Sequence, residues 1–358
     1  MRCICPLLTQ SGHQASLNGP RFHRYDARSG RRGVTVRRRE FLGFLGSAAA
    51  WPLATLAQQP PVIGLLGSAT ASGWARYVSA FQQGLRDGGY VEGRNVAIEV
   101  RWADNQYDRL PPMAAELVQR QMTLIVAFST PAARAAKAAT ATIPIVFTTT
   151  SDPVQIGLVA SLNRPGGNMT GVTLRSVEVG AKLLELLHEA VPTAKNMALL
   201  VNPTNPQTNT LSRNLQAAAR TSGLQLHVLN ASTEREFDTV FATLGQLRVD
   251  GLIIGSDVLF TTSIGQLAAL TVRQRLPAVF QNRDFAAAGG LMSYGGSVTE
   301  SYRQAGVYAG RILKGEKPAD LPVVQATKVE LALNLKTAKS FGISFPISLL
   351  GRADEVIE

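Results

Sequence analysis

The order of strands and helices constrains the fold of this chain more than any other feature. Apolar runs typical of buried strands alternate with amphipathic helical segments over residues 61–147, and again in the same order over residues 196–284. Strands that alternate with helices form parallel βαβ units. Two such series of similar length predict an α/β protein with two Rossmann-like lobes, each built on a parallel sheet.

The segments between and after the two series predict how the lobes are connected. Residues 148–173 combine a helix-start signal at Asp152, a Pro-Gly-Gly-Asn break and a short β-like piece, MTGVT. Further along, LMSYG is expected to return to the first lobe before the chain crosses again, which makes multiple crossover strands and suits a clamshell. The expected lobes comprise residues 61–171 plus about 294–322, and residues 172–293 plus about 323–350.

The first 57 residues are interpreted as an extension and an export signal. Three arginines, Arg37–Arg39, precede Phe41, Leu42 and a short apolar run that ends at Ala57. A charged region followed by a short apolar region and a small residue is typical of a secretory signal, and the arginine pattern resembles the twin-arginine type. We therefore expect cleavage near Ala57 and a periplasmic protein.

The charge and cysteine content of the body exclude several classes of protein. The net charge of +11 comes largely from nine arginines in residues 1–57, and the rest of the chain carries 27 basic and 23 acidic side chains. A nucleic-acid-binding domain needs a basic face of its own, so this balance argues against one. Both cysteines, Cys3 and Cys5, precede the body, which leaves it without a disulfide, a thiolate nucleophile or a cysteine metal site.

The candidate ligand-binding residues follow the ends of the predicted strands. In open parallel sheets, ligands bind outside the carboxyl ends of the strands. Helix starts near Pro131 and after Asp152 offer N–H groups to a carboxylate, and Asp257 can take an ammonium group. The candidates are Ser68, Thr70, Ser129, Thr130, Thr149, Ser151, Asp152, Asn202, Ser256, Asp257, Arg283 and Phe285.

Several of these residues also have a purely structural interpretation. Asp152, Ser129 and Thr130 are typical helix caps. Trp74 could close over an aromatic or apolar ligand, but it begins an apolar helical stripe that favours a place in the core. Asp257 has the best case for function, because a lone carboxylate after a buried apolar run needs a partner. Phosphate-binding glycine loops, zinc motifs and the nucleophile elbow are absent from the sequence. We therefore expect no catalysis, no cofactor and no metal.

Five long motifs give the chain a resemblance to a known family. They are GYVEGRNVAIEVRWADNQYDRLP, TTTSDPVQIGLVASLNRPGGNMTGV, LLVNPTNP, AAGGLMSYG and RILKGEKPADLPVVQATKVELALNLKTAKSFGI. With these motifs the chain resembles the substrate-binding proteins of ABC transporters, including members that bind tryptophan and other aromatic amino acids. The resemblance implies a type I periplasmic binding fold and capture of a small solute between the lobes. It also implies delivery of the solute to a membrane permease with its ATPase.

Three other functions compete with solute capture for transport. The sequence does not distinguish a transport protein from a ligand-sensing partner of a membrane receptor. A secreted enzyme on the same scaffold is disfavoured by the missing motifs, and a transcriptional regulator lacks an N-terminal DNA-binding module. The expected protein is a monomer that binds an amino acid or a related carboxylate and meets the membrane only through the permease.

Overall fold

The computed structural model describes residues 60–174, 176–326 and 329–358. The chain from Gln59 onward forms one compact unit. The expected export signal and its cleavage point lie outside the described residues. Within those residues, no helix has the length and apolar character needed to cross a membrane.

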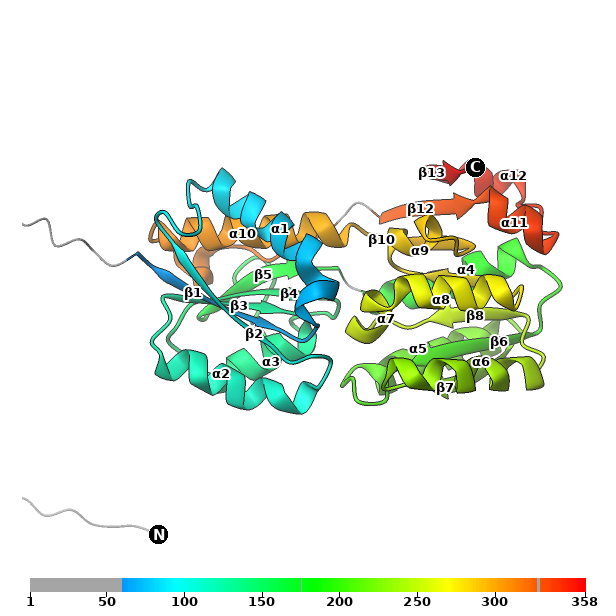
Figure 1. Cartoon of the computed structure of the whole chain (residues 1–358), viewed down its shortest axis with the longest axis horizontal. Coiled ribbons are helices and arrows are strands. Elements are labelled where there is room, and N and C mark those ends of the chain that lie inside the picture. Colours follow the sequence, from blue (N-terminus) through cyan, green and yellow to red (C-terminus); the bar gives the residue numbers. More distant parts are fainter. Residues whose placement is uncertain (1–59, 175, 327–328) are drawn as a thin grey trace, which may run out of the picture. The chain divides into compact units, whose positions relative to one another are not determined.

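The first lobe is built on a parallel sheet with the strand order β11-β5-β4-β3-β1-β2. Figure 1 shows α1 and α10 over one face of this sheet and α2 and α3 over the other. The strands are β1 (Val62–Gly67), β2 (Ala97–Trp102), β3 (Leu124–Phe128), β4 (Ile145–Thr149), β5 (Met169–Thr173) and β11 (Val324–Gln325). The helices are α1 (Ala71–Asp87), α2 (Leu110–Gln119), α3 (Thr130–Ala139) and α10 (Val298–Leu313), with the 3-10 turns η1 (Tyr107–Arg109) and η3 (Pro318–Asp320).

The second lobe has the strand order β13-β12-β10-β9-β8-β6-β7. Its sheet is parallel except that β12 runs antiparallel to β10 and carries β13 with it. The strands are β6 (Asn196–Val201), β7 (Gln225–Asn230), β8 (Gly251–Ile254), β9 (Ala278–Phe280), β10 (Met292–Gly296), β12 (Val329–Asn334) and β13 (Glu355–Ile357). The helices are α4 (Ser176–Ala190), α5 (Thr208–Thr221), α6 (Phe237–Gln246), α7 (Val258–Thr262), α8 (Ile264–Arg273), α9 (Arg283–Ala287), α11 (Leu335–Phe341) and α12 (Ile347–Leu350), with η2 (Glu234–Glu236).

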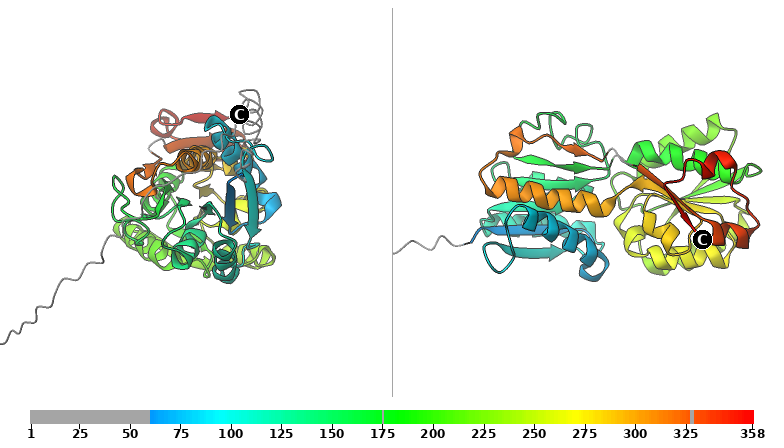
Figure 2. Two further views of the ribbon diagram at one scale, coloured as in Figure 1. Left: turned by 90° about the vertical axis from the view of Figure 1, so that its left-hand side faces the viewer. Right: turned by 90° about the horizontal axis from the view of Figure 1, so that it is seen from above.

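The two Rossmann-like lobes expected from the sequence are present, and the chain passes between them after β5, after β10 and after β11. The segment LMSYG does not return to the first lobe, because it forms β10 and pairs with β9 and β12. The return is made by α10, which packs on α1 (Figure 2). Each of the three crossings between the lobes lies a few residues later in the chain than the sequence predicts.

Helix α1 illustrates why these sequences fold as they do. Thr70 caps its start by accepting a hydrogen bond from the Gly73 amide (3.3 Å), and Gly88-Gly89 ends it, with Gly89 at φ 87°. Between these ends, Trp74, Tyr77, Phe81 and Leu85 recur every three or four residues and are buried. The spacing puts them on one helix face, against the sheet and α10.

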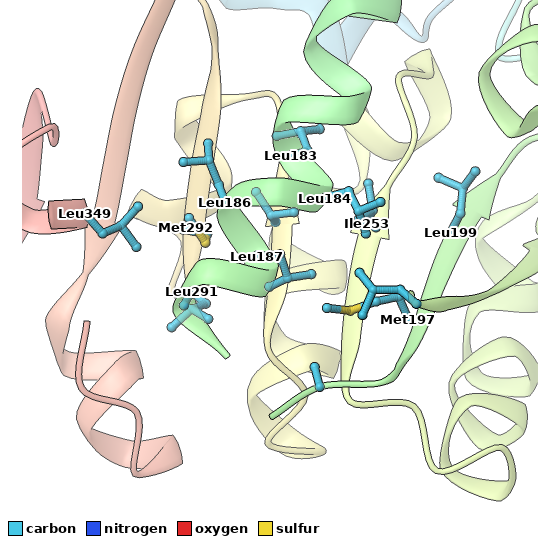
Figure 3. Packing of buried hydrophobic residues seen from close by; sticks show 14 of the residues in the cluster. Leu183, Leu184, Leu186, Leu187, Met197, Leu199, Ile253, Leu291, Met292 and Leu349 are labelled. Atoms are coloured by element: carbon cyan, nitrogen blue, oxygen red, sulfur yellow. The ribbon is translucent and has the colours of Figure 1, made fainter. Parts of the chain in front are cut away.

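Each sheet has a hydrophobic core on both faces. In the second lobe, leucines of α4 such as Leu183 and Leu187 pack against Met197, Leu199 and Ile253 of the central strands (Figure 3). Each fully buried leucine contributes about 1.5–3 kcal/mol relative to an exposed one. These cores make each lobe a stable body, so the carboxyl ends of its strands present side chains in fixed positions.

Candidate functional site

The carboxyl ends of both sheets border one cleft, which is open to solvent. Its first-lobe wall comes from the ends of β3 and β4 and the starts of α1, α3 and α10. Its second-lobe wall comes from the residues that follow β8 and β9, together with α7.

Asp257 lies in the second-lobe wall as an almost completely buried carboxylate. Its Oδ1 accepts hydrogen bonds from Asn202 (3.1 Å) and from the Leu259 amide (2.9 Å) at the start of α7. Its Oδ2 accepts from Asn205 (2.7 Å) and from the hydroxyl of Tyr107 (2.8 Å). Tyr107 belongs to the first lobe, so this last bond joins the two walls of the cleft.

Burial dominates the titration of Asp257. It raises the pKa of this carboxyl, whereas the hydrogen bonds from Asn202, Asn205, Tyr107 and the Leu259 amide lower it. Burial and the charge of Asp257 raise the pKa of the Tyr107 hydroxyl well above its usual range, so Tyr107 remains a proton donor. The donors that reach Asp257 from the described part of the chain are thus all neutral, an arrangement that favours a cation.

The start of α3 forms part of the first-lobe wall. Ser129 caps this helix by accepting a hydrogen bond from the Ala132 amide (3.3 Å), and Pro131 supplies no amide. Ser129 has a φ of 114°, a region that L-residues other than glycine rarely adopt. Such strain persists only where the surroundings hold it, and it is concentrated at functional sites. The helix start offers the positive end of its dipole and few free amides.

The hydroxyl groups at the ends of β1, β3 and β4 bond to one another. Ser68 and Ser129 share a hydrogen bond of 2.5 Å. Thr130 shares one of 2.7 Å with Thr149 and one of 3.3 Å with Ser151. These bonds fix the hydroxyls as a rigid polar strip, of which Ser129, Thr130 and Thr149 line the cleft.

One end of the cleft is aromatic. Trp74 and Tyr302 line it, with ring centroids 6.1 Å apart in an edge-on arrangement. Both rings continue into the first-lobe core through Tyr77, which lies 4.8 Å from Trp74 and 5.2 Å from Tyr302, and through Phe128, 4.4 Å from Tyr302. Because the core fixes these rings, they form a preformed wall for an apolar or aromatic group.

A second set of contacts joins the lobes outside the cleft lining. The Tyr77 hydroxyl accepts hydrogen bonds from Asn282 (3.0 Å) and Arg76 (2.5 Å), and Arg76 forms an ion pair with Asp284. The start of α1 also lies against α7, since a methyl group at Gly73 would be 2.6 Å from Thr262 Cγ2. Helix α1 therefore supplies much of the contact between the lobes.

The candidate residues predicted from the sequence lie in the cleft lining, directly behind it, or away from it. Ser129, Thr130, Thr149, Ser256 and Asp257 line the cleft. Ser68, Ser151 and Asn202 lie directly behind these residues and bond to them, and Thr70 caps α1. Arg283 pairs instead with Glu355, and Phe285 is fully buried against Phe280 in the second-lobe core.

Asp152 does not begin a helix. Its Oδ1 accepts hydrogen bonds from the Val154 and Gln155 amides (2.9 and 3.2 Å), which closes a turn. Gly157 then takes a φ of 70° and ends the helical geometry after this turn. The anion-binding helix start expected after Asp152 is therefore absent, and Asp152 does not line the cleft.

Several residues that line the cleft were not candidates. Tyr107, Thr148 and Tyr302 are three of these residues. Only the fold brings these three to the same cleft as Asn205, Gln281 and Val298. For Tyr107, the polar sequence DNQY directly after β2 was an available signal, because it also follows a strand end. Among the described residues there is no cluster of acidic, histidine or cysteine side chains that could hold a metal ion.

The fold defines the class of this protein as a two-lobed α/β protein of the type I periplasmic binding fold. The sequence profile of the family described as ABC transporter substrate binding protein matches residues 69–357. The chain belongs to that family. The resemblance found in the sequence is thus confirmed, and with it the expected fold.

Three relatives illustrate the similarity. The chain is 29% identical to the tyrosine-binding protein of Clostridioides difficile, over 73% of this chain and 74% of the relative. It is 25% identical to an ABC domain from Streptococcus pneumonia in complex with L-Trp (TM-score 0.73, covering 83% of this chain and 100% of the other). It is 26% identical to a ligand-free, open substrate binding protein with adhesive properties from Clostridium difficile (TM-score 0.58, 83% and 99%).

The two solved relatives differ in how well they superimpose on this chain, although their identities and coverages are similar. The TM-score is higher for the L-Trp complex than for the ligand-free, open protein. In the arrangement of lobes described here, the two walls of the cleft are in direct contact. The contacts that join Tyr107 to Asp257 and Tyr77 to Asn282 belong to this arrangement.

Proposed function

We propose that this protein captures an amino acid in the cleft, in the periplasm, and delivers it to an ABC permease for import. The observation that carries the proposal is the pairing of a buried carboxylate, Asp257, with a hydroxyl-lined helix start at Ser129 on the opposite wall. A zwitterion needs an anion at one end and donors at the other. A ligand that meets both walls binds the closed form better than the open form.

The ammonium group of the ligand is assigned to Asp257. The carboxylate offers about four acceptor positions, and all of them are taken by neutral donors, of which Tyr107 alone comes from the first lobe. An incoming ammonium replaces or shares the bond from Tyr107, and a charge-assisted bond is stronger than a neutral one. The ligand carboxylate meets the start of α3, where Ser129 and Thr130 present hydroxyls near the positive end of the helix dipole.

The side chain of the ligand is assigned to the aromatic end of the cleft. Trp74, Tyr302 and Val298 supply apolar surface there, and an aromatic ring packs favourably edge-on or offset against such rings. The names of the tyrosine-binding and L-Trp-bound relatives agree with this assignment. We infer an aromatic amino acid as the solute class.

The ligand acts by shifting an equilibrium between open and closed lobes. Only the closed form docks productively on the permease, whose ATPase drives import. The protein acts as a monomer without catalysis, and its export signal directs it to the periplasm.

A thermal-shift screen of the purified protein tests the solute class. At a concentration 100 times its dissociation constant, a ligand adds about 2.7 kcal/mol of apparent stability, which in a chain of this size raises the melting temperature by several degrees. We expect this shift with aromatic amino acids and none with sugars or purines. A shift with sugars alone, or with the decarboxylated amine as strongly as with the amino acid, would contradict the proposal.

The affinity is expected to depend on pH through Asp257. Ammonium binds the ionised carboxylate, and burial raises the pKa at which Asp257 loses this charge. As the pH falls through the raised pKa, affinity is lost at a higher pH than for an exposed aspartate. The neighbouring titratable group, Tyr107, stays protonated throughout because its pKa is raised well above its usual range. Calorimetric titrations at a series of pH values, with a variant carrying Asp257→Asn as control, measure this dependence.

A further inference from the structure

The first turn of α1 touches the second lobe beside the cleft, at Gly73. A Cβ atom at this position would lie close to two atoms of Thr262 in α7, Cγ2 at 2.6 Å and Cβ at 3.1 Å. Groups packed this tightly leave no room for an added methyl group. Neither Gly73 nor Thr262 lines the cleft. The lack of a side chain at Gly73 is thus what allows α1 to come this close to α7.

The side chain of Thr262 is held in this position by its own helix. Its hydroxyl donates to the carbonyl oxygens of Leu259 (2.9 Å) and Val258 (3.2 Å). A rotation that moved the methyl group away from α1 would break these bonds. The other atom close to Gly73 is Thr70 Oγ1 (3.0 Å), which belongs to the cap of α1 itself. Thr262 is therefore a fixed obstacle that the second lobe presents to α1.

A hydrogen bond on the next turn of α1 indicates that the lobes are in full contact. The Tyr77 hydroxyl accepts from Asn282 of the second lobe (3.0 Å), and both residues are at most 4% exposed. Each partner is fixed by its own lobe. The Tyr77 ring packs on Trp74, with ring centroids 4.8 Å apart, and Asn282 caps α9 through the Asp284 amide (3.1 Å). A bond between two fixed groups forms only at one separation of the lobes.

We propose that Gly73 and Thr262 form a stop that sets how closely the two lobes approach in the closed form. Gly73 is the positioning residue, because any side chain at this position would hold α1 and α7 further apart. The affinity for every ligand then depends on a contact that lies outside the cleft lining. This inference rests on the proposed function, since it concerns the closure that a bound amino acid favours.

The stop lies next to both walls of the cleft. Trp74 and Thr261, the chain neighbours of the two residues of the stop, line the cleft. Between the same walls, the Tyr107 hydroxyl lies 2.8 Å from Asp257 Oδ2. A further separation of about 1 Å would break this bond, because hydrogen bonds weaken steeply beyond their usual length. A ligand that spans the two walls loses its contacts in the same way, whatever its side chain.

Calorimetric titration of a Gly73→Ala variant tests the stop. We expect its affinity for L-tryptophan and for L-phenylalanine to fall by the same factor, about tenfold or more, which is the usual effect of overpacking a fitted contact. The matched control is Gly265→Ala in the first turn of α8, where a Cβ meets nothing within 4 Å. Adding Thr262→Ser to Gly73→Ala removes the obstructing methyl group and keeps the hydroxyl, so it is expected to restore most of the affinity.

The distance between the lobes provides a second readout. Spin labels are attached to cysteines introduced by Gln119→Cys in α2 and Arg220→Cys in α5, both at exposed positions, after the two native cysteines are replaced by serine. With saturating amino acid, electron paramagnetic resonance is expected to show a longer distance in the Gly73→Ala variant than in the control. Adding Thr262→Ser is expected to return the distance to the control value. A general loss of folding would not be reversed by the removal of one methyl group.

The outcomes separate this inference from the proposed function. Equal affinity of the Gly73→Ala and Gly265→Ala variants, or an equal distance between their lobes, overturns the inference and leaves amino-acid binding intact. A loss of affinity that Thr262→Ser does not restore also overturns it, because the loss then arises at the cap of α1, where Thr70 is the other close residue. Binding of no amino acid by the unaltered protein overturns the proposed function itself, and the inference with it.

Discussion

A variant with Asp257→Asn is expected to lose most of its affinity for an amino acid. Truncating one partner of a buried, hydrogen-bonded charge pair costs about 2–5 kcal/mol of binding free energy, a loss of roughly 30-fold to more than 1,000-fold. Asparagine keeps the shape of the side chain and one acceptor oxygen, but it carries no charge for the ammonium. Titration calorimetry with an aromatic amino acid measures the loss, and circular dichroism checks the fold.

The Asp284→Asn variant is the matched control for this experiment. Asp284 is also a second-lobe carboxylate at the contact between lobes, but it pairs with Arg76 and does not line the cleft. Its neutralisation is expected to change the affinity little, because its ion pair is partly exposed. Unchanged affinity in the Asp257→Asn variant would refute the assignment of the ammonium to Asp257.

Truncation of Asp257 to alanine is expected to add a loss of folding stability. It leaves the donors of Asn202, Asn205 and the Leu259 amide without their acceptor, and a buried unsatisfied donor costs about 1–3 kcal/mol. The bond to the Leu259 amide is also the cap of α7, and the loss of a cap alone costs about 1 kcal/mol. The asparagine variant is therefore the cleaner test of binding.

The second large effect is expected from Gly306→Ala, where α10 crosses α1. A Cβ at Gly306 would lie 2.0 Å from the Phe81 carbonyl oxygen, and one at Gly84 would lie 1.8 Å from that of Arg303. Both obstacles are backbone atoms, so the helices must separate. Overpacking a core costs about 1–3 kcal/mol and sometimes more, and we expect about 3 kcal/mol or more of lost unfolding free energy.

Urea denaturation of the Gly306→Ala variant measures this loss. Gly245→Ala in α6 is the control, because a Cβ there meets nothing within 4 Å. It is expected to be neutral or to stabilise by up to about 1 kcal/mol through its helix propensity. A Gly306→Ala variant as stable as the control would show that α1 and α10 do not approach as closely as described.

The separation of these helices would also reach the cleft. Trp74 is on α1 and Tyr302 is on α10, and their rings form the aromatic end of the cleft only while the helices are in contact. The Gly306→Ala variant is therefore expected to bind its ligand more weakly wherever it remains folded. The same crossing of helices thus governs both stability and the shape of the site.

Local patterns predicted much of the fold because each pattern has one favourable solution. The stripe from Trp74 to Leu85 can bury its apolar face only as a helix, and the runs at β1, β3 and β6 can be buried only inside a sheet. The helix expected after Asp152 is an exception. Asp152 and Pro153 begin a turn as they would begin a helix, but the positive φ of Gly157 ends it. LMSYG was assigned to the wrong lobe because pairing partners of strands are not encoded locally.

The lining of the cleft was predicted where a residue directly follows the end of a strand. Ser129 and Thr130 follow β3 of the first sheet and Asp257 follows β8 of the second, so each lies at the carboxyl end of its own sheet, where both sheets border the cleft. Phe285 was misassigned, because a phenylalanine after a strand end is as suited to the core as to a ligand. It packs against Phe280 without access to the cleft.

The sequence by itself determined the two lobes, their parallel sheets and the family, because these depend on short-range periodicity and on long motifs. Only the tertiary structure decided that Tyr107 of the first lobe bonds to Asp257 of the second, 150 residues away in the chain. It also brought Trp74, Thr148 and Tyr302 together at one end of the cleft. Contacts between distant segments depend on how helices and sheets pack against one another, and local sequence patterns do not predict that packing.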